Sequence, residues 1–294
     1  MNEPVHILNE QAAAAAFSKQ APLFDELYTG DSIIQYKRKR VRDHVLYYLP
    51  PRSHILELNA GTGEDAVFFA RYGHTVHATD ISDTMQARLK EKAILNNLQI
   101  SISDEVCSFT ELESLSARGP YDLIFSNFAG LNCTHELAKV LRSFDSLLKP
   151  GGYATLVILP KFCLWEFILL FKGKFKTAFR RFTGSKGAKA HIEGQFFRCW
   201  YYNPSFVKKN LQDSFEMISL EGLCSIAPPS YIEKFAEKHP KAWKFLKNKE
   251  DKWKTKWPWR SIGGEGLLYY YASEKRLKNI QGNDALSHSV FRYK

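Results

Sequence analysis

The middle of the chain alternates short apolar runs with segments in which apolar residues recur every three or four positions. The short runs predict buried strands and the periodic segments predict helices. Their alternation predicts a mainly parallel sheet covered on both faces. The expected strands lie at residues 55–58, 74–80, 100–107, 121–127, 153–159, 215–220 and 264–272. We therefore expect an α/β fold with a seven-stranded, doubly wound sheet whose seventh strand lies at the edge.

Two helices are expected before the first strand. Residues 9–28 include five consecutive alanines, which favour helix by intrinsic propensity. Residues 32–48 place apolar side chains on one face and contain a basic run at Lys37–Arg40. This run is interpreted as a solvated helix face, with contact to nucleic acid as the alternative. Pro50 and Pro51 end the second helix.

The turn after the first strand indicates a ligand site. Its sequence is Asn59-Ala60-Gly61-Thr62-Gly63, with Glu57 inside the preceding strand and Glu64-Asp65 opening the next helix. Glycine allows close approach of the backbone to a ligand, because no Cβ intervenes. A dinucleotide site rests a pyrophosphate on such a helix start, where acids would repel it. The turn therefore favours a ligand with a cationic amino or sulfonium group.

The next two strand ends add candidate ligand contacts. The second strand ends at Asp80, 17 residues after Gly63. A carboxylate at this place can accept hydrogen bonds from both ribose hydroxyls of a nucleoside. The end of the third strand is ambiguous, because Asp104 could lie at the rim. The favoured register instead places Ser108 and Phe109 there.

Three segments carry a resemblance to a known family. They are the turn at 57–63, YDLIFSN at 121–127 and LLKPGG at 147–152. Together they resemble the class I S-adenosylmethionine-dependent methyltransferases of the small-molecule type, most strongly over residues 54–160. Asn59 departs from the family pattern, which usually has its first glycine here, but asparagine tolerates a left-handed backbone. The resemblance implies a Rossmann-like core with S-adenosyl-L-methionine as cofactor and S-adenosyl-L-homocysteine as product.

The resemblance also assigns roles to individual residues. It implies that Asp80 holds the ribose, that Ile81 follows the adenine face, and that Ser108 stands where the family has an acid for the adenine amino group. Tyr28 is the candidate to close over the methionine end, with Tyr36 as a second candidate and simple packing as the alternative. No metal site is expected. The expected cofactor-binding residues are Tyr28, Glu57, Asn59, Ala60, Gly61, Gly63, Asp80, Ile81, Ser108, Phe109 and Asn127.

Composition limits the protein's surroundings and partners. The five cysteines are scattered, without a C-x-x-C pair, so neither a disulfide framework nor a structural zinc site is supported. The first residues lack the pattern of a secretory signal, and no run of eighteen apolar residues occurs. We therefore expect a cytoplasmic protein. Residues 161–260 hold 21 Lys and Arg against 9 Asp and Glu, so the net charge of +10 resides in this region.

Two segments interrupt the core pattern. Residues 162–182 place apolar residues before alternating cations and phenylalanines, which predicts a lid over an apolar substrate. Ordinary packing and weak contact with a membrane surface are the alternatives. Residues 228–260 interleave lysines with tryptophans, a pattern that can bind single-stranded nucleic acid. The spacing of the lysines at 234, 238, 241, 244 and 247 instead predicts one helix face, so a nucleic-acid partner is not favoured.

The chain is thus divided into a core with inserted lid segments. The expected divisions are an N-terminal helical cap at 1–50, a cofactor-binding core at 51–160, a lid insertion at 161–202, a core helix and strand at 203–222, a basic aromatic insertion at 223–262, the last core strand at 263–275 and a tail at 276–294. This organisation predicts an enzyme that moves a methyl group to a small, apolar or aromatic acceptor. The cationic surplus predicts an anionic handle on that acceptor.

The catalytic residues are less determined than the cofactor site. A general base is needed only if the acceptor is a weakly acidic hydroxyl or a carbon acid. The candidates are His135, His191 and Tyr201. Three other functions stay open: a nucleic-acid methyltransferase that uses the basic insertions, a dehydrogenase, which Glu57 disfavours, and a non-catalytic protein that binds the cofactor.

Overall fold

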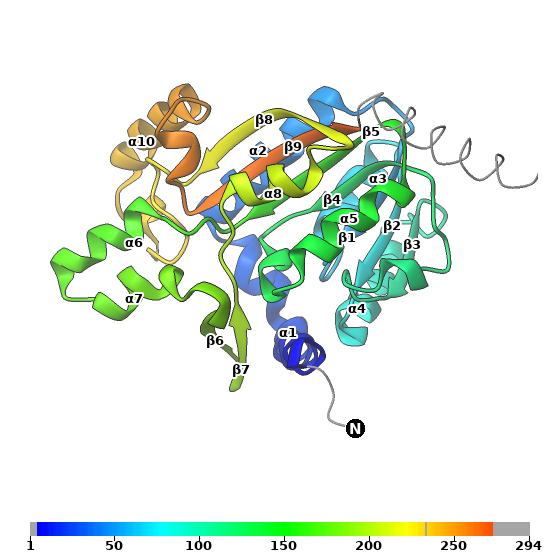
Figure 1. Ribbon diagram of the computed structural model, residues 1–294, viewed down its shortest axis with the longest axis horizontal. Helices are drawn as coiled ribbons and strands as arrows, with labels where there is room; N and C mark the ends of the chain where they lie inside the picture. Colours follow the sequence, from blue (N-terminus) through cyan, green and yellow to red (C-terminus); the bar gives the residue numbers. More distant parts are fainter. Residues whose placement is uncertain (1–4, 233, 273–294) are drawn as a thin grey trace, which may run out of the picture.

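The computed structural model describes residues 5–232 and 234–272, and the expected tail at 276–294 lies outside them. Its centre is a seven-stranded sheet in the order β3-β2-β1-β4-β5-β9-β8 (Figure 1). All neighbouring pairs are parallel except those made by β9, which is antiparallel to β5 and β8. The strands are β1 (His54–Leu58), β2 (Thr75–Asp80), β3 (Ile102–Val106), β4 (Tyr121–Ser126), β5 (Leu148–Ile158), β8 (Phe215–Leu223) and β9 (Glu265–Ala272).

The predicted seven-stranded sheet is confirmed, but two details were wrong. β9 lies between β5 and β8, so the edge strand is β8 and not the last strand. β5 begins at Leu148, whereas residues 149–152 were expected to form a turn before it. Tyr121 pairs with Leu148 and Leu123 with Tyr153, so the register shifts and a bulge absorbs the extra residues.

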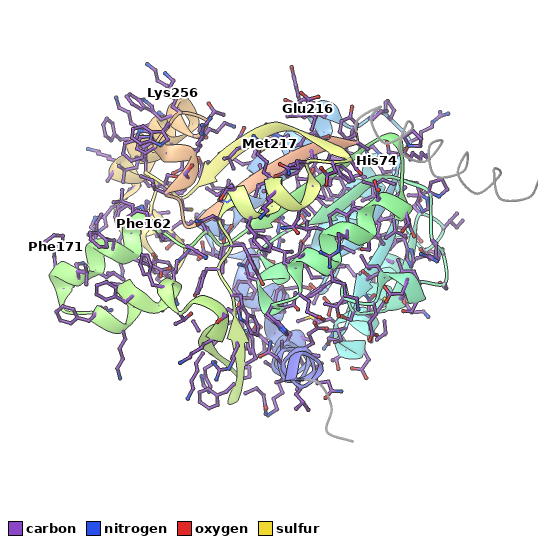
Figure 2. The ribbon with its side chains drawn as sticks, in the orientation of Figure 1. His74, Phe162, Phe171, Glu216, Met217 and Lys256 are labelled. Atoms are coloured by element: carbon purple, nitrogen blue, oxygen red, sulfur yellow. The ribbon has the colours of Figure 1, made fainter. Side chains whose placement is uncertain are left out.

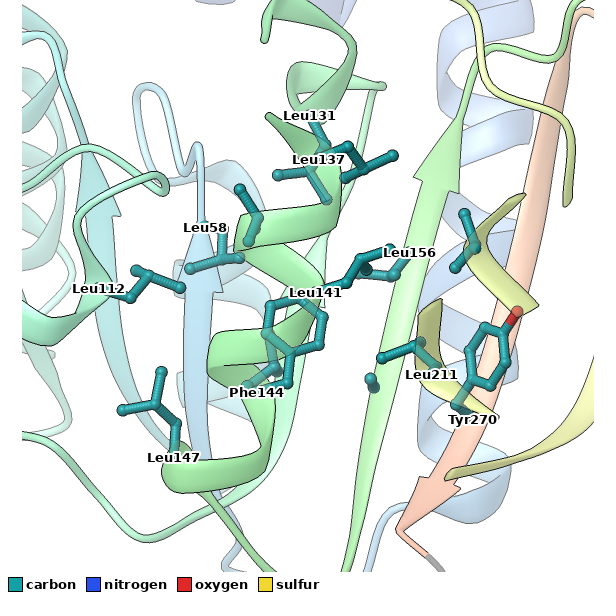
Figure 3. Close-up of a cluster of buried hydrophobic side chains, with 14 of the residues drawn as sticks. Leu58, Leu112, Leu131, Leu137, Leu141, Phe144, Leu147, Leu156, Leu211 and Tyr270 are labelled. Carbon is teal, nitrogen blue, oxygen red and sulfur yellow. The ribbon is translucent and has the colours of Figure 1, made fainter. Parts of the chain in front are cut away.

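Both faces of the sheet are covered by helices, as the apolar runs of the strands require. α5 (Leu137–Leu147) and α8 (Pro204–Leu211) pack on one face, in front of the sheet in Figure 1. Figure 3 shows Leu141 and Phe144 of α5 directed toward the strands in this core. α2 (Ser32–Tyr48), α3 (Glu64–Arg71) and α4 (Asp83–Leu95) form the second core on the other face.

The N-terminal cap consists of α1 (Val5–Thr29) and α2, as predicted. Asp31 caps α2 by accepting hydrogen bonds from the backbone N–H groups of Ile33 and Ile34. The basic run in α2 is not a solvated face, because Lys37, Arg38 and Arg40 are all buried. Helical periodicity alone did not predict this burial. Each of the three is paired with a carboxylate distant in sequence.

The remaining segments lie beyond the carboxyl end of β5 and between β8 and β9. The short helices α6 (Leu164–Ile168) and α7 (Phe175–Phe179) form a projecting arm, and β6 (Ala188–Ile192) pairs with β7 (Gln195–Cys199) in a hairpin (Figure 1). The hairpin was not predicted, since residues 184–194 were interpreted as a loop. The lysines at 234, 238, 241, 244 and 247 do not all share one helix face, because α9 (Phe235–Lys238) ends before α10 (Pro240–Trp253) begins. Among the described residues, no helix is long and apolar enough to cross a membrane.

Candidate functional site

Two adjoining hollows lie at the carboxyl ends of β1, β2 and β4, with α1 contributing to both. The first has a volume of about 700 Å³ and reaches Asp80, Ile81, Ser108 and Phe109. The second has a volume of about 830 Å³ and reaches Glu57, Asp65, Lys37 and Arg38. Both are lined by Phe17, Phe24, Asn59, Gly61, Asn127 and Phe128. This is the place where ligands bind in doubly wound sheets.

Asp80 is fixed at the end of β2 in the first hollow. Its carboxylate accepts hydrogen bonds from the backbone N–H groups of Gly61 and Ser82, both at 2.9 Å. Burial raises the pKa of Asp80, and these backbone hydrogen bonds oppose the rise. Each carboxylate oxygen retains a second lone pair for a ligand hydroxyl.

Glu57 is the most isolated charged group in the second hollow. It is buried, and its Oε2 has no hydrogen-bond partner within the described part of the chain. Burial and the nearby Asp65 raise the pKa of Glu57 well above its ordinary value. A buried carboxylate oxygen without a donor is costly unless a ligand supplies one. A cationic ligand group would both pair with Glu57 and favour its ionised form.

The acids at the start of α3 are paired within the protein, which the sequence did not indicate. Asp65 accepts from Arg42 Nε at 2.6 Å and from Asn127 Nδ2 at 2.9 Å. Glu64 accepts from Lys92 Nζ at 2.5 Å and from Arg38 at 3.3 Å. Their charge is therefore largely balanced, and Glu57 carries the preference for a cation.

Asn59 has the left-handed backbone that its place in the turn requires, with φ of 50°. Its side chain joins two strand ends, since Nδ2 donates to the Asn127 carbonyl and Oδ1 accepts from Ser126 Oγ. Gly63, in contrast, does not line either hollow. A Cβ at Gly63 would lie 2.5 Å from Leu89 Cγ, so this glycine permits close packing of α3 on α4.

α1 is fastened across the hollows by polar contacts along its length. Ser18 Oγ lies 2.7 Å from Ser82 Oγ, and Asp25 accepts from Thr62 Oγ1 at 2.6 Å. The β6–β7 hairpin supports α1 from outside, because Asn9 exchanges hydrogen bonds with the backbone of Arg198. The insertion thus supports the cover of the site instead of forming it.

Cations and aromatic rings meet in the second hollow. Lys37 Nζ lies 5.3 Å and the Arg38 guanidinium carbon 4.9 Å from the centre of the Phe128 ring. Lys37 also pairs with Glu265 at 2.6 Å. Phe128 itself has a left-handed backbone, with φ of 52°. Such backbone strain is concentrated at functional sites.

Most expected cofactor residues come together, but the catalytic candidates do not. Every expected cofactor-binding residue except Gly63 lines a hollow. His135 is exposed beside Trp200, His191 is exposed beside Phe196, and Tyr201 is buried under Arg181; none of them lines either hollow.

The second tyrosine candidate and the predicted lid also lie elsewhere. Tyr36 donates to Asp251 at 2.9 Å, on the side of α2 that faces α10. No residue of 161–202 lines either hollow. Phe171, Phe175 and Phe179 of the arm are instead exposed, and Figure 2 shows Phe171 at the margin of the molecule. Contact of this arm with a membrane surface stays a prediction.

Several site residues were not singled out from the sequence. Glu10, Lys37 and Arg38 line the hollows, although sequence reasoning did not place them there. All three belong to the N-terminal helices, which reach the site only through packing against distant strands.

Comparison with known proteins agrees with this geometry. Residues 55–152 match the family described as methyltransferase domain. Trichosetin synthetase PKS-NRPS1 of Gibberella fujikuroi is 33% identical over 114 residues, which cover 35% of this chain and 3% of that protein. The S-adenosyl-L-methionine-dependent Diels-Alderase iccD of Talaromyces variabilis is 37% identical over 112 residues, which cover 37% of each chain. The chain therefore spans well under half the length of these curated relatives.

The fold extends beyond the matched segment. The structure is similar to that of 1,6-didemethyltoxoflavin-N1-methyltransferase from Burkholderia thailandensis, with a TM-score of 0.55, 12% identity and coverage of 93% of both chains. At this identity the likeness shows the fold alone. Its coverage of 93% of this chain exceeds that of the sequence match, which ends at residue 152 near the start of β5.

Proposed function

We propose that the chain is a class I S-adenosylmethionine-dependent methyltransferase that transfers a methyl group to a small, apolar or aromatic acceptor with an anionic handle. The match of residues 55–152 to a methyltransferase domain supports this proposal. The observation that carries this proposal is the composition of the second hollow. Aromatic rings line it together with two buried cations, Lys37 and Arg38. An anionic aromatic molecule satisfies both features.

The residues of the hollows fit the family's cofactor. Glu57 Oε2 is a buried acceptor that needs a donor, which the cofactor's amino group would supply. Asp80 has free lone pairs for the ribose hydroxyls. A Cβ at Gly61 would meet nothing within 4 Å, so this part of the turn opens onto the hollow. Glu57, Gly61, Asp80 and Asn127 would therefore hold the cofactor across both hollows.

The cofactor supplies a methyl group bound to a positively charged sulfur. The protein's task is then mainly to position the acceptor and exclude water, because a well-oriented pair of reactants needs little further assistance. Phe17, Phe24 and Phe128 line the apolar boundary at which the two hollows meet. Their rings would hold an aromatic acceptor against that boundary.

No histidine is found among the described residues that line the hollows. The proposal therefore assigns no general base to His135, His191 or Tyr201. Lys37 and Arg38 are paired with Glu265 and Glu64, but each keeps further N–H donors that would favour the anion of an acidic group on the acceptor. An acceptor that loses its proton near neutral pH, such as an activated phenol or enol, fits this arrangement.

The test begins with calorimetric titration of S-adenosylhomocysteine into wild type, Asp80→Ala and Asp83→Ala. Loss of the ribose hydrogen bonds should weaken binding by about 1–3 kcal/mol, roughly a five- to hundred-fold change in affinity. Asp83 is exposed at the start of α4 and lines neither hollow, so its variant should bind like wild type. Absence of binding to ligand-free wild type would overturn the proposal.

The second part of the test follows the methyl group. Wild type is given cofactor with a labelled methyl group and pairs of phenolic acceptors that differ only in a carboxylate or its methyl ester. We expect label in the product and a higher kcat/KM for the carboxylate. Since one relative is named a Diels-Alderase, cyclisation of an acceptor with the label retained on the cofactor would replace methyl transfer as the function.

A further inference from the structure

Glu10 presents an unused carboxylate oxygen to the first hollow. The side chain belongs to α1 and is 5% exposed. Its Oε2 accepts hydrogen bonds from Ser108 Oγ at 2.6 Å and from Thr110 Oγ1 at 2.9 Å. Its Oε1 is buried and has no hydrogen-bond partner among the residues that the structure describes. Glu10 lines the hollow together with Asp80, Ser108 and Phe109.

The hydrogen bonds around Ser108 show that Ser108 donates to Glu10, so that the Glu10 carboxylate acts as an acceptor. Ser108 Oγ accepts from the backbone N–H of Thr110 at 3.1 Å, so its own proton is available to Glu10. Oε2 then receives two hydroxyl donors, whereas Oε1 receives none. An ionised carboxylate accepts hydrogen bonds at both oxygens. A ligand in the hollow would supply the missing donor.

The two strand ends place Glu10 where a nucleoside base would lie. Asp80 at the end of β2 is paired with Val106 at the end of β3, two residues before Ser108. A ribose held by Asp80 directs its base toward Ser108 and Phe109. The class I pattern has an acid at the position of Ser108, and this chain lacks it.

We propose that Glu10, supplied by the N-terminal helix, replaces that acid and accepts a hydrogen bond from the exocyclic amino group of adenine through Oε1. The inference rests on the proposed function, because it requires an adenosine ligand in the first hollow. It makes α1 a part of base recognition as well as a cover. Ser108 and Thr110 are then positioning residues that orient the carboxylate.

The decisive variant is Glu10→Gln, which keeps the size of the side chain. The glutamine carbonyl oxygen can still accept from Ser108 and Thr110, so the amide N–H₂ group takes the place of Oε1. The amide N–H₂ group and the adenine amino group are both donors, so they cannot form a hydrogen bond with each other in this arrangement. The amide can instead donate to the 6-oxo group of hypoxanthine, the base of the inosyl ligand. The substitution should therefore change which base is preferred.

The experiment is calorimetric titration of S-adenosylhomocysteine and S-inosylhomocysteine into wild type, Glu10→Gln and Glu26→Gln. Glu26 is an exposed residue of α1 and serves as the matched control. Wild type and Glu26→Gln should prefer the adenosyl ligand by about ten- to hundred-fold, the range expected for loss of one buried hydrogen bond to a base edge. Glu10→Gln should lose that preference or invert it.

Each other outcome has a definite meaning. Equal weakening of both ligands by Glu10→Gln would overturn the inference, because Glu10 would then only fasten α1. If that variant does not fold, Glu10→Asp is used, which keeps the charge but withdraws the carboxylate from the hollow. It should weaken binding of the adenosyl ligand without strengthening binding of the inosyl ligand. Unchanged discrimination between the two ligands would overturn the inference. Wild type that binds both ligands equally would also overturn it, while leaving the proposed function intact. Failure of wild type to bind either would overturn the proposed function itself.

Discussion

Asn59 and Gly130 form a matched pair at the scale of single residues. Asn59 stands where class I methyltransferases usually have a glycine, and its side chain occupies space beside the loop after β4. A Cβ at position 130 would lie 2.4 Å from Asn59 Cγ. The larger residue in one turn is thus accommodated by the absence of a side chain in the other. Neither position can be understood from its own segment alone.

We expect Gly130→Ala to destabilise the protein by about 1–3 kcal/mol through overpacking. Asn59→Gly removes the hydrogen bonds to Ser126 and Asn127 but relieves the clash. The double variant should therefore be more stable than the sum of the single effects by about 1 kcal/mol or more. Urea denaturation measures each free energy of unfolding. Gly30→Ala is the control, because a Cβ there meets nothing within 4 Å, and strictly additive effects would contradict the pairing.

The difference between contacts within one segment and contacts between distant segments explains which site residues the sequence could predict. The sequence predicted Glu57, Asn59 and Asp80 because each lies at or beside the carboxyl end of a strand. Ligands bind at these ends in a parallel sheet. Glu10 and Lys37 were not found, because they reach the hollows from helices that pack across the sheet. Periodicity identifies a helix and its apolar face, but it does not identify the buried carboxylate that a basic residue will meet.

At the scale of elements, the arm at residues 161–182 is held by one buried carboxylate. Glu166 accepts from Arg180 Nη2 at 2.7 Å and from Arg181 Nη2 at 2.6 Å. Arg181 Nη1 also donates to two backbone carbonyls next to core strands. Pro160 lies just after β5, and Gly264 lies just before β9. Burial alone would raise the pKa of Glu166, but the hydrogen bonds from both arginines lower it. The exposed aromatics of the arm therefore project from a rigid base.

We expect Glu166→Gln to cost about 3 kcal/mol of stability, because Arg181 is then buried without a counter-charge. The arm should also open locally before the core unfolds. Trypsin cleavage at Lys172, Lys174 and Lys176 would report that opening, and urea denaturation would report the global effect. Asp43→Asn is the control, since its pair with Lys39 is exposed and should contribute little. Unchanged cleavage at the three lysines would show that Glu166 does not anchor the arm.

At the scale of the whole molecule, a buried charge cluster joins the cap, the sheet edge and the second insertion. Arg40 of α2 pairs with Glu221 of β8 at 2.9 Å and with Glu250 of α10 at 2.8 Å. Glu250 also accepts from the backbone N–H groups of Cys224, Ile226 and Ala227. The basic insertion predicted at 223–262 is thus tied into the core by the buried carboxylate of Glu250.

Glu221 gives this cluster a characteristic dependence on pH. Burial alone would raise its pKa, but hydrogen bonds from His44 and Lys254 and the charge of Arg40 lower it to about 2. A carboxylate with a lowered pKa in the folded state stabilises the protein fully above its unfolded pKa, about 4.3. That contribution, about 3 kcal/mol, is lost as the pH falls from about 4.3 toward 2.

Urea denaturation of wild type and Glu221→Gln between pH 7 and pH 2.5 tests this dependence. The stability difference between them should be largest at neutral pH and should shrink below about pH 4.3, because acid removes the same charge from wild type that the substitution removes. Glu91→Gln is the control, since Glu91 is exposed. Burial raises the pKa of Glu250, so this second acid acts in the opposite sense. It shares Arg40 with Glu221, so the difference between the two curves reports the coupled pair. A difference that stays constant with pH would contradict the lowered pKa of Glu221.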